Sequence, residues 1–261
     1  MRQNAIKRKL KNGEFVFGTM IKESTRIGIV DILELAGFDY LVIDMEHATY
    51  DMPMIADILQ YARKSDITGV VRIPVLNYSN VSKALDMGAE GIWVPHVDTV
   101  EETEQLVQYG KYPPEGKRGA AVPPFRMKEM KAAENAVAYF KGCNEEVLLI
   151  AQMESRQAIG DVDNIAGVDG IDVLMMGTQD LSMDMGYTAQ GNHPEVVAAV
   201  QKVVDACKKA NIASGNHIAS IEQLRYWMEQ GMRMITYTYP PTFIIDRGQE
   251  AIKSLKEGIV D

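Results

Sequence analysis

The feature that most constrains the fold of this chain is a short pattern that occurs four times along it. A helix-like stretch ends at a glycine, a brief turn follows, and an apolar run typical of a strand begins; the glycines are Gly37, Gly88, Gly167 and Gly231. Glycine readily adopts the left-handed conformation that closes a helix, and buried parallel strands are rich in apolar residues. Each copy therefore predicts a helix followed by a strand of a parallel sheet.

Extending this pattern over all 261 residues predicts eight strands that alternate with helices. The strands are expected at 16–20, 40–44, 69–73, 92–94, 147–153, 171–176, 212–215 and 234–238. The helices are expected at 25–36, 52–64, 80–87, 100–109, 156–165, 195–209, 221–230 and 242–256. Eightfold alternation favours one (β/α)8 (TIM) barrel domain over residues 1–261, rather than an open doubly wound sheet. The gap at 110–146 is expected to hold a functional loop and a helix near 127–140.

Composition and charge narrow the class of function. With 36 acidic against 27 basic residues, the formal net charge is -9, which is the wrong sign for broad binding to phosphate backbones. We therefore expect no nucleic-acid partner. No apolar run exceeds five residues and the stretch 1–17 lacks the apolar core of a secretory signal, so neither a membrane span nor export is expected. Cys143 and Cys207 lie outside any metal-binding spacing. These features predict a cytoplasmic protein.

Polar residues follow several predicted strands, at the ends where a barrel places its reactive groups. They are Asp44, Glu46 and His47 after the second strand, Arg72 in the third, Gln152 and Glu154 in the fifth, and Asp180 after the sixth. All of them are expected to meet at one mouth of the barrel. Charged groups this close to buried strands need a partner or a cation, so their convergence predicts a functional site.

Each of these residues has a functional and a structural interpretation. Glu154 and Asp180 are candidate ligands of Mg²⁺ or Mn²⁺, because two carboxylates completed by waters suit these ions; two solvated carboxylates are the alternative. His47 is a candidate general acid or base, oriented by a neighbouring carboxylate. Arg72 has the donors to hold a carboxylate or a developing enolate, or to form an internal salt bridge with the carboxylates after the second strand.

Other polar residues carry less weight. His96, His193 and His217 fall near predicted loops and are not expected to be ligands. Asp86 lies near the end of a helix, where a surface residue is the simpler interpretation. Lys22 follows the first strand, but no predicted strand interior holds a lysine, which disfavours a Schiff-base aldolase.

Six segments together resemble the HpcH/HpaI aldolase family, the metal-dependent pyruvate aldolases that act on 4-hydroxy-2-oxo acids. The segments are AGFDYLVIDMEHA at 36–48, VVRIP at 70–74, LDMGA at 85–89, YPPEGKRG at 112–119, QMES at 152–155 and GTQDLSMDMG at 177–186. The likeness covers nearly the whole chain. It implies a (β/α)8 barrel whose last helix is exchanged with a neighbouring subunit, in cytoplasmic homo-oligomers that are hexamers built from dimers.

The resemblance also implies roles for individual residues. Carried over by position, Glu154 and Asp180 bind the divalent metal, which is Mg²⁺, Mn²⁺ or Co²⁺, and Arg72 stabilises the pyruvate enolate. His47, supported by Asp44, takes part in proton transfer. The further candidates are Asp86, which is similar to a family residue that organises the site across a subunit contact, and the substrate-binding residues Gln152, Thr178 and Gln179.

Two segments depart from the family pattern. Family members have Gly-Pro-Ala-Asp or Gly-Pro-Ser-Asp before the second metal ligand, and backbone amides there hold the substrate carboxylate. This chain instead has the sequence GTQD at 177–180. Near the C-terminus Tyr237 and Tyr239 replace part of a small, Val- and Asp-containing segment and are expected at the barrel mouth. Both changes bear on the shape of the pocket and on the choice of aldehyde.

The implied reaction cleaves a 4-hydroxy-2-oxo acid into pyruvate and an aldehyde. The oxo acid chelates the metal through its carboxylate and keto oxygens, and a base removes the 4-hydroxyl proton as the C3–C4 bond breaks. The remaining enolate is then reprotonated. An oxaloacetate decarboxylase or a citryl- or malyl-CoA-type lyase passes through a similar enolate and is an alternative on the same scaffold. A barrel that binds an oxo acid without turnover is a more distant alternative.

Overall fold

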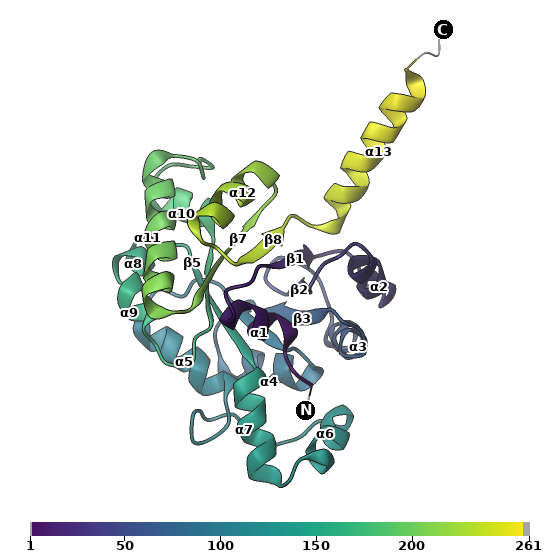
Figure 1. Cartoon of the computed structure of the whole chain (residues 1–261), viewed down its shortest axis with the longest axis vertical. Coiled ribbons are helices and arrows are strands. Elements are labelled where there is room, and N and C mark those ends of the chain that lie inside the picture. The colour runs from purple at the N-terminus through teal and green to yellow at the C-terminus, as the bar shows by residue number, and fades with distance from the viewer. Residues whose placement is uncertain (1, 258–261) are drawn as a thin grey trace.

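The computed structural model describes residues 2–257; residues 1 and 258–261 of the predicted domain lie outside them. Within that range eight parallel strands close into a barrel in chain order, and β8 pairs with β1 (Figure 1). The strands are β1 (Val16–Ile21), β2 (Tyr40–Asp44), β3 (Thr68–Arg72), β4 (Gly91–Val94), β5 (Leu148–Met153), β6 (Val173–Met176), β7 (Ala213–Ile218) and β8 (Met234–Tyr237). The predicted (β/α)8 barrel is confirmed.

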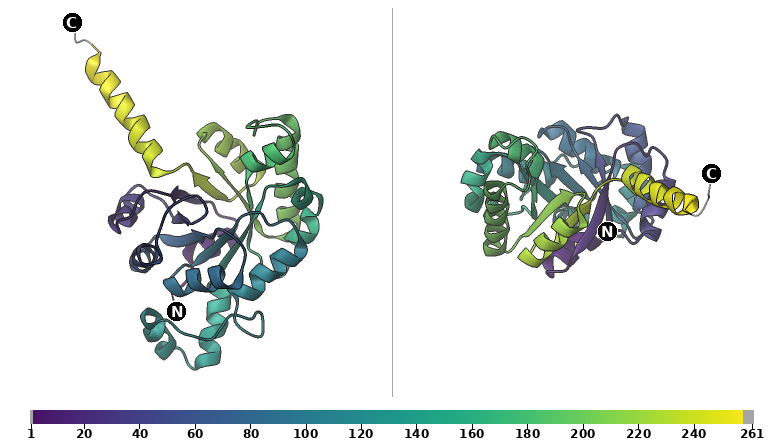
Figure 2. Two further views of the ribbon diagram at one scale, coloured as in Figure 1. Left: turned by 180° about the vertical axis from the view of Figure 1, so that it is seen from behind. Right: turned by 90° about the horizontal axis from the view of Figure 1, so that it is seen from above.

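Helices lie outside the barrel between successive strands, as the alternating pattern predicts (Figures 1 and 2). They are α2 (Gly28–Leu35), α3 (Met52–Ala62), α4 (Tyr78–Met87), α5 (Val100–Gly110), α8 (Arg156–Gly160), α9 (Val162–Ala166), α11 (Pro194–Ala210) and α12 (Ile221–Gln230). The helix expected at 156–165 is interrupted at Asp161, which separates α8 from α9. Side-chain caps fix several helix starts; Thr99 and Glu102, for example, form a capping box at α5.

Several helices were not predicted as such. They are α1 (Ala5–Lys11), the 3-10 helix η1 (Pro124–Arg126), α6 (Met127–Ala132), α7 (Ala136–Glu146) and α10 (Thr178–Asp184). The long gap after α5 therefore holds two α-helices where one was expected near 127–140. None of the helices within residues 2–257 combines the length and the apolar character that crossing a bilayer requires.

Three of the four glycines in the repeated pattern take the left-handed conformation as predicted. Gly37, Gly88 and Gly231 have φ angles of 89°, 123° and 111°. The prediction is wrong for Gly167, which follows α9 with a right-handed φ of -78°. Gly170 takes the positive φ of 99° in this copy instead, so the reversal into β6 occurs three residues later than the pattern indicates.

The interior of the barrel is filled by alternate residues of the strands. They form one buried cluster that includes Val16, Tyr40, Val42, Val70, Trp93, Leu148, Ile150, Val173, Met175 and Met234. Ile6 and Leu10 of α1 join this cluster, so α1 covers the amino end of the barrel. The residues between them on each strand pack against the surrounding helices in a second cluster. The strand interiors are thereby buried on both faces, and polar groups are left to the two ends.

The last helix, α13 (Pro240–Lys256), leaves the barrel and projects away from it in both figures. Its apolar side chains Ile244, Ile245, Ile252 and Leu255 are exposed. A helix that leaves several large apolar residues in water is unusual for an isolated protein. The exchange of this helix with a neighbouring subunit stays a prediction.

Candidate active site

The alternation of side chains along the strands brings four predicted site residues to the inside of the barrel, at its carboxyl end. On β2, Val42 faces the interior of the barrel, and Asp44, two residues later, points to the same side. The register of the sheet pairs Asp44 with Arg72 of β3. On β5 the interior row continues to Gln152 and then to Glu154, directly after the strand. All four side chains are buried. Polar and charged side chains are buried only when they are paired with one another or with a ligand.

Arg72 and Asp44 form a bidentate ion pair in the mouth. Arg72 Nε lies 2.9 Å from Asp44 Oδ1, and Arg72 Nη2 lies 2.7 Å from Asp44 Oδ2. Arg72 Nη1 is 3.0 Å from Glu46 Oε2, and Lys22 Nζ is 3.4 Å from Asp44 Oδ2. Burial acts to raise the pKa of Asp44, but the hydrogen bonds and charge of Arg72 outweigh it and hold this pKa below its ordinary value. The internal salt bridge predicted for Arg72 is confirmed, with both carboxylates.

Glu154 is a buried carboxylate with contacts on both oxygens. Its Oε1 accepts the backbone N–H of His96 at 2.7 Å and lies 3.0 Å from His96 Nδ1. Its Oε2 accepts a hydrogen bond from Gln152 Nε2, and Gln152 Oε1 accepts one from Trp93 Nε1 at 2.5 Å. Burial raises the pKa of Glu154, and the nearby charge of Asp180 raises it further. A cation bound to this carboxylate would lower the pKa of Glu154 and so oppose both burial and the charge of Asp180.

Gly177 follows β6 where the backbone passes close to this carboxylate. A Cβ atom at this position would collide with the Glu154 carboxylate and the Gln152 amide, so only glycine fits. The unpredicted helix α10 begins at the next residue and holds Asp180 in its first turn. The structure therefore brings Asp180 to the site on a helix, where the sequence predicts only a residue after a strand.

Glu154 and Asp180 offer carboxylate oxygens, the ligand type that suits a divalent cation whose remaining coordination is supplied by other molecules. Within residues 2–257 no cluster of three or more His, Cys, Asp or Glu side chains is arranged to hold a metal ion. Two carboxylates leave the remaining positions to water and substrate oxygens, which is how Mg²⁺ and Mn²⁺ are usually bound at substrate sites. Burial is the main cause of the raised pKa of Glu154, and a cation beside this carboxylate would oppose it by favouring the charged form.

His47 lies at the mouth, but Asp44 does not hold its ring. The imidazole is 58% exposed, and its Nε2 atom is 3.7 Å from Glu46 Oε2. Asp44 Oδ1 instead accepts the backbone N–H groups of Glu46 at 3.0 Å and of His47 at 3.3 Å. Asp44 thus supports His47 by ordering the turn that carries it. The carboxylate that lies near the imidazole ring is Glu46.

Asp86 lies apart from the other predicted site residues. It is near the end of α4, just before the chain enters β4, so it belongs to the amino end of the barrel. Its Oδ1 atom is 2.6 Å from Arg118 Nη2, and its Oδ2 atom is 3.5 Å from Ser82 Oγ. A single chain does not bring Asp86 to Arg72 or Glu154. Its role across a subunit contact stays a prediction.

A groove of about 680 Å³ opens beside the mouth. Its lining combines apolar surface, including Ala189, Pro194, Ile218 and Ala219, with amide, hydroxyl and imidazole groups of Thr178, Gln179, Gln190, Asn192, His193, His217, Gln223, Thr238 and Tyr239. His217 Nε2 lies 3.2 Å from the Thr238 carbonyl oxygen, and burial lowers the pKa of His217 to about 4. This imidazole is therefore neutral at pH 7, and the groove has hydrogen-bonding rather than charged walls.

The two C-terminal tyrosines behave differently. Tyr239 lines the groove, and Lys22 Nζ lies 5.6 Å from the centroid of its ring. Tyr237 instead stacks on Phe243 of α13, with ring centroids 5.6 Å apart, and packs against the core outside the barrel. The prediction that both tyrosines lie at the mouth is wrong for Tyr237, which follows the inward-facing Thr236 and therefore points out of the barrel. Tyr239 lies beyond the end of β8, after Thr238 with its positive φ of 34°, so the alternation of the strand does not extend to it.

Sequence reasoning gave no role in the site to three residues that the structure places near it, which are Lys22, His96 and His217. Each follows or ends a strand, so the rule that selects Asp44 and Glu154 would also select them. His96 takes the left-handed φ of 52°, and its Nε2 atom lies 3.5 Å from Glu46 Oε1. It therefore connects the carboxylates of Glu46 and Glu154 across the mouth.

The chain forms a closed parallel barrel, and carboxylates and an arginine gather at the carboxyl end of its strands. This arrangement is typical of (β/α)8-barrel enzymes. Within this class, the chain belongs to the HpcH/HpaI aldolase/citrate lyase family, whose model matches residues 21–243. The family and the fold predicted from the sequence are thereby confirmed.

Individual relatives agree with this assignment. A hydroxypyruvate/pyruvate aldolase of Roseobacter denitrificans is 29% identical over 255 residues, which cover 98% of both chains. A 5-keto-4-deoxy-D-glucarate aldolase of an Enterobacter species is 34% identical over 206 residues, which cover 78% of both. The crystal structure of an HpcH/HpaI aldolase from Desulfitobacterium hafniense is similar with a TM-score of 0.90 at 30% identity, over 98% of this chain and 99% of that one.

Proposed function

We propose that this chain is a divalent-metal-dependent aldolase that cleaves a 4-hydroxy-2-oxo acid into pyruvate and an aldehyde. Family membership and the relatives named as aldolases support a pyruvate-type carbon–carbon lyase. The observation that carries the proposal is the position of Arg72 in the same mouth as the carboxylates of Glu154 and Asp180. A cation and a guanidinium there would face the same enolate oxygen.

Glu154 and Asp180 would hold the cation, which is Mg²⁺, Mn²⁺ or Co²⁺. When bound, such an ion is a Lewis acid that polarises the 2-keto group and stabilises the negative charge that develops on its oxygen. Gln152 keeps the Glu154 carboxylate in place through the hydrogen bond to Oε2, and the backbone N–H of His96 does the same at Oε1. Both contacts orient this ligand before the substrate arrives.

Arg72 contributes charge and donors to the same oxygen. A guanidinium has five N–H donors, of which Arg72 uses two on Asp44 and directs Nη1 to Glu46. N–H groups therefore remain on Nη1 and Nη2 for a substrate oxygen. Because the two carboxylates already fix the guanidinium, it does not need to reorganise as negative charge develops, and it favours the enolate over the neutral keto acid.

His47 is our candidate for proton transfer. In the cleavage direction its imidazole takes the proton of the 4-hydroxyl, the C3–C4 electron pair passes to the enolate, and the aldehyde leaves. A proton returned to C3 then converts the enolate into pyruvate. The carboxylate of Glu46, 3.7 Å from Nε2, stabilises the imidazolium that forms in between.

The groove beside the mouth would receive the aldehyde half of the substrate. Its amide and hydroxyl side chains, together with the neutral imidazole of His217, could form hydrogen bonds with an aldehyde that carries hydroxyl groups. An alkyl aldehyde of the same length would lose these hydrogen bonds and should be a poorer substrate. We expect kcat/KM to fall at least tenfold when the hydroxyl groups are removed.

We also infer a homo-oligomer in which α13 packs against a second copy of the chain. The exposed apolar side chains of this helix support the inference, since Ile244 and Leu255 are 75% and 70% exposed. An Ile252→Glu variant should lower the mass measured by light scattering, whereas Lys253→Gln on the same helix should not. An unchanged mass for Ile252→Glu would rule out this contact.

The experiment that tests the function measures pyruvate release from 4-hydroxy-2-oxo acids, with oxaloacetate as a parallel substrate. Variants His47→Gln and His96→Gln separate the two exposed imidazoles at the mouth. We expect His47→Gln to lower kcat at least a hundredfold with little change in KM, and His96→Gln to have the smaller effect on kcat. Release from oxaloacetate alone would replace the aldolase proposal by a decarboxylase.

A further inference from the structure

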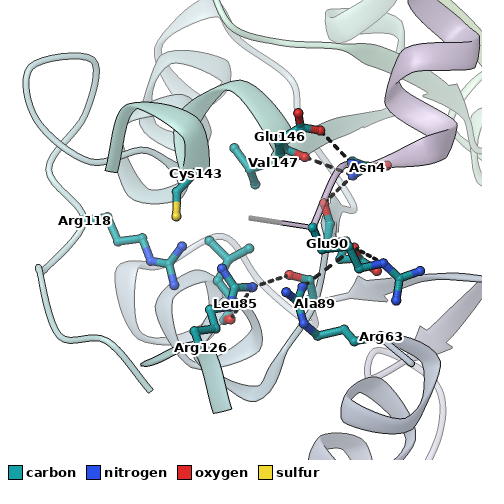
Figure 3. A pocket seen from close by; sticks show the side chains of 11 residues that line it. Asn4, Arg63, Leu85, Ala89, Glu90, Arg118, Arg126, Cys143, Glu146 and Val147 are labelled. Carbon is teal, nitrogen blue, oxygen red and sulfur yellow. Dashed lines mark hydrogen bonds and ion pairs between the residues drawn. The ribbon is translucent and has the colours of Figure 1, made fainter. Parts of the chain in front are cut away.

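A second polar cavity lies at the end of the barrel opposite to the mouth. It is formed by the N-terminal segment, the end of α4, η1 and the C-terminal part of α7 (Figure 3). Glu90 and Val147, which line it, directly precede β4 and β5, so the cavity belongs to the amino ends of these strands. The cavity has no part in the chemistry proposed for the mouth.

Arginines surround this cavity, and most of them have a carboxylate partner. The pairs are Arg2 with Glu90 at 3.2 Å, Arg63 with Glu129 at 2.5 Å and Arg118 with Asp86 at 2.6 Å. Glu146, which also lines the cavity, pairs with the exposed Arg8 at 2.5 Å. Glu90 also lies 3.7 Å from Arg63, so it is shared between two cations. These carboxylates are therefore already balanced by other arginines.

Arg126 is the exception, because it forms no ion pair with any of the described residues. Its Nη2 atom lies 3.3 Å from the carbonyl oxygen of Ala89 and 3.4 Å from that of Leu85, which are long contacts to neutral groups. Its side chain is nevertheless buried, with the whole residue only 7% exposed. Glu90 attracts this guanidinium at longer range, but no described carboxylate forms an ion pair with it, so its buried charge is only partly neutralised.

Two donors that face the cavity also lack partners. The Nε atoms of Arg118 and Arg126 have no hydrogen-bond acceptor within residues 2–257, although Arg118 is only 3% exposed. Figure 3 shows both side chains extending into the space that Cys143 and Val147 border from the side of α7. Glu90 Oε2, from another lining residue, also lacks a partner, so only the side of the cavity formed by the two unpartnered cationic donors is suited to an anion.

We propose that this cavity binds one small monatomic anion, of the chloride type, between Arg118 and Arg126. The cavity volume is about 30 Å³, which is enough for a water molecule or a small ion. This space therefore admits a halide. A water molecule could accept the hydrogen bonds, but it would add no negative charge beside Arg126.

The first test compares unfolding by urea in sodium chloride and in sodium gluconate at constant ionic strength. The urea midpoint of the wild-type chain should rise with chloride and then saturate, because an ion that binds the folded state stabilises it by mass action. In Arg126→Met the midpoint should not respond to chloride. Lys141→Met, which removes an exposed cation from α7, should respond like the wild type. A wild-type midpoint that is the same in both salts, or a chloride response that persists in Arg126→Met, would overturn the proposal.

The second test needs no variant and covers the case in which Arg126→Met does not fold. Crystals of the wild-type chain grown in sodium bromide should give an anomalous peak between the guanidinium groups of Arg118 and Arg126. An ordered water without anomalous signal at this position would contradict the proposal. Neither test measures turnover, so both outcomes are independent of the aldolase activity.

Discussion

The ion pair between Arg72 and Asp44 yields a prediction whose size can be worked out from the structure. Asp44 is fully buried and receives two hydrogen bonds from Arg72, at 2.9 and 2.7 Å. Removing one partner of a buried pair costs roughly 3–5 kcal/mol of stability, because the other charge is left uncompensated. In Arg72→Met, Lys22 remains 3.4 Å from Asp44 and offsets part of the loss, so we expect about 3 kcal/mol.

A double-mutant cycle isolates this interaction. Asp44→Asn should also destabilise the fold, and the variant with both substitutions should be less destabilised than the sum of the two, with a coupling energy of about 2 kcal/mol. The assay is urea unfolding at pH 7. The matched comparison is the exposed pair of Lys209 and Asp163, 3.3 Å apart, whose coupling should stay below about 0.5 kcal/mol.

The coupling energy between Arg72 and Asp44 should also depend on pH. Because the folded-state pKa of Asp44 is lowered, its contribution is complete above the unfolded pKa of about 3.9 and is lost as the pH falls through the folded value. The coupling energy should therefore decrease only below about pH 4. A coupling at pH 7 no larger than that of the exposed pair would refute the assignment of Arg72 and Asp44 as a preorganised unit.

Three further predictions concern the proposed metal ligands, the glycine beside Glu154 and the half-buried histidine His217. Glu154→Gln combined with Asp180→Asn should abolish Mn²⁺ binding in titration calorimetry while the circular dichroism spectrum is retained; unchanged affinity would contradict the ligand assignment. Gly177→Ala should weaken Mn²⁺ binding at least tenfold because its Cβ collides with the Glu154 carboxylate, whereas Gly160→Ala, which meets no atom within 4 Å, should leave the affinity unchanged. His217 has a folded pKa of about 4, below the unfolded value of about 6.5, so the unfolded state takes up a proton first as the pH falls. Stability measured by urea unfolding should therefore fall between about pH 6.5 and 4, by about 3 kcal/mol in total, and His217→Gln should remove this component.

The fold could be predicted from the sequence because its signals are local. The apolar runs mark all eight strands within residues 2–257, and glycines such as Gly37 and Gly231 mark the reversals between helix and strand. The same reasoning fails at Gly167, where the left-handed residue is Gly170. Either glycine allows the turn, and only the packing of α9 against the barrel decides which of them takes the positive φ.

The candidate site was partly predictable for a different reason. Residues that end strands of a closed barrel converge at one mouth, and this rule identified Asp44, Arg72 and Glu154. It does not separate inward-facing from outward-facing residues at the end of a strand, so the placement of Tyr237 at the mouth is wrong. It also cannot show that Asp44 bonds to the backbone of His47 rather than to its ring. Such details depend on register and loop conformation.

The measurement that tests the central claim most directly is pyruvate release from a 4-hydroxy-2-oxo acid in the presence of Mg²⁺ or Mn²⁺, after EDTA treatment, and in Arg72→Lys. The account predicts release that depends on the metal, that is lost with EDTA and restored by the added ion. Release should fall at least a hundredfold in Arg72→Lys, because lysine keeps the charge but not the fixed fork of donors. Full release in EDTA, or an undiminished rate in Arg72→Lys, would contradict the account.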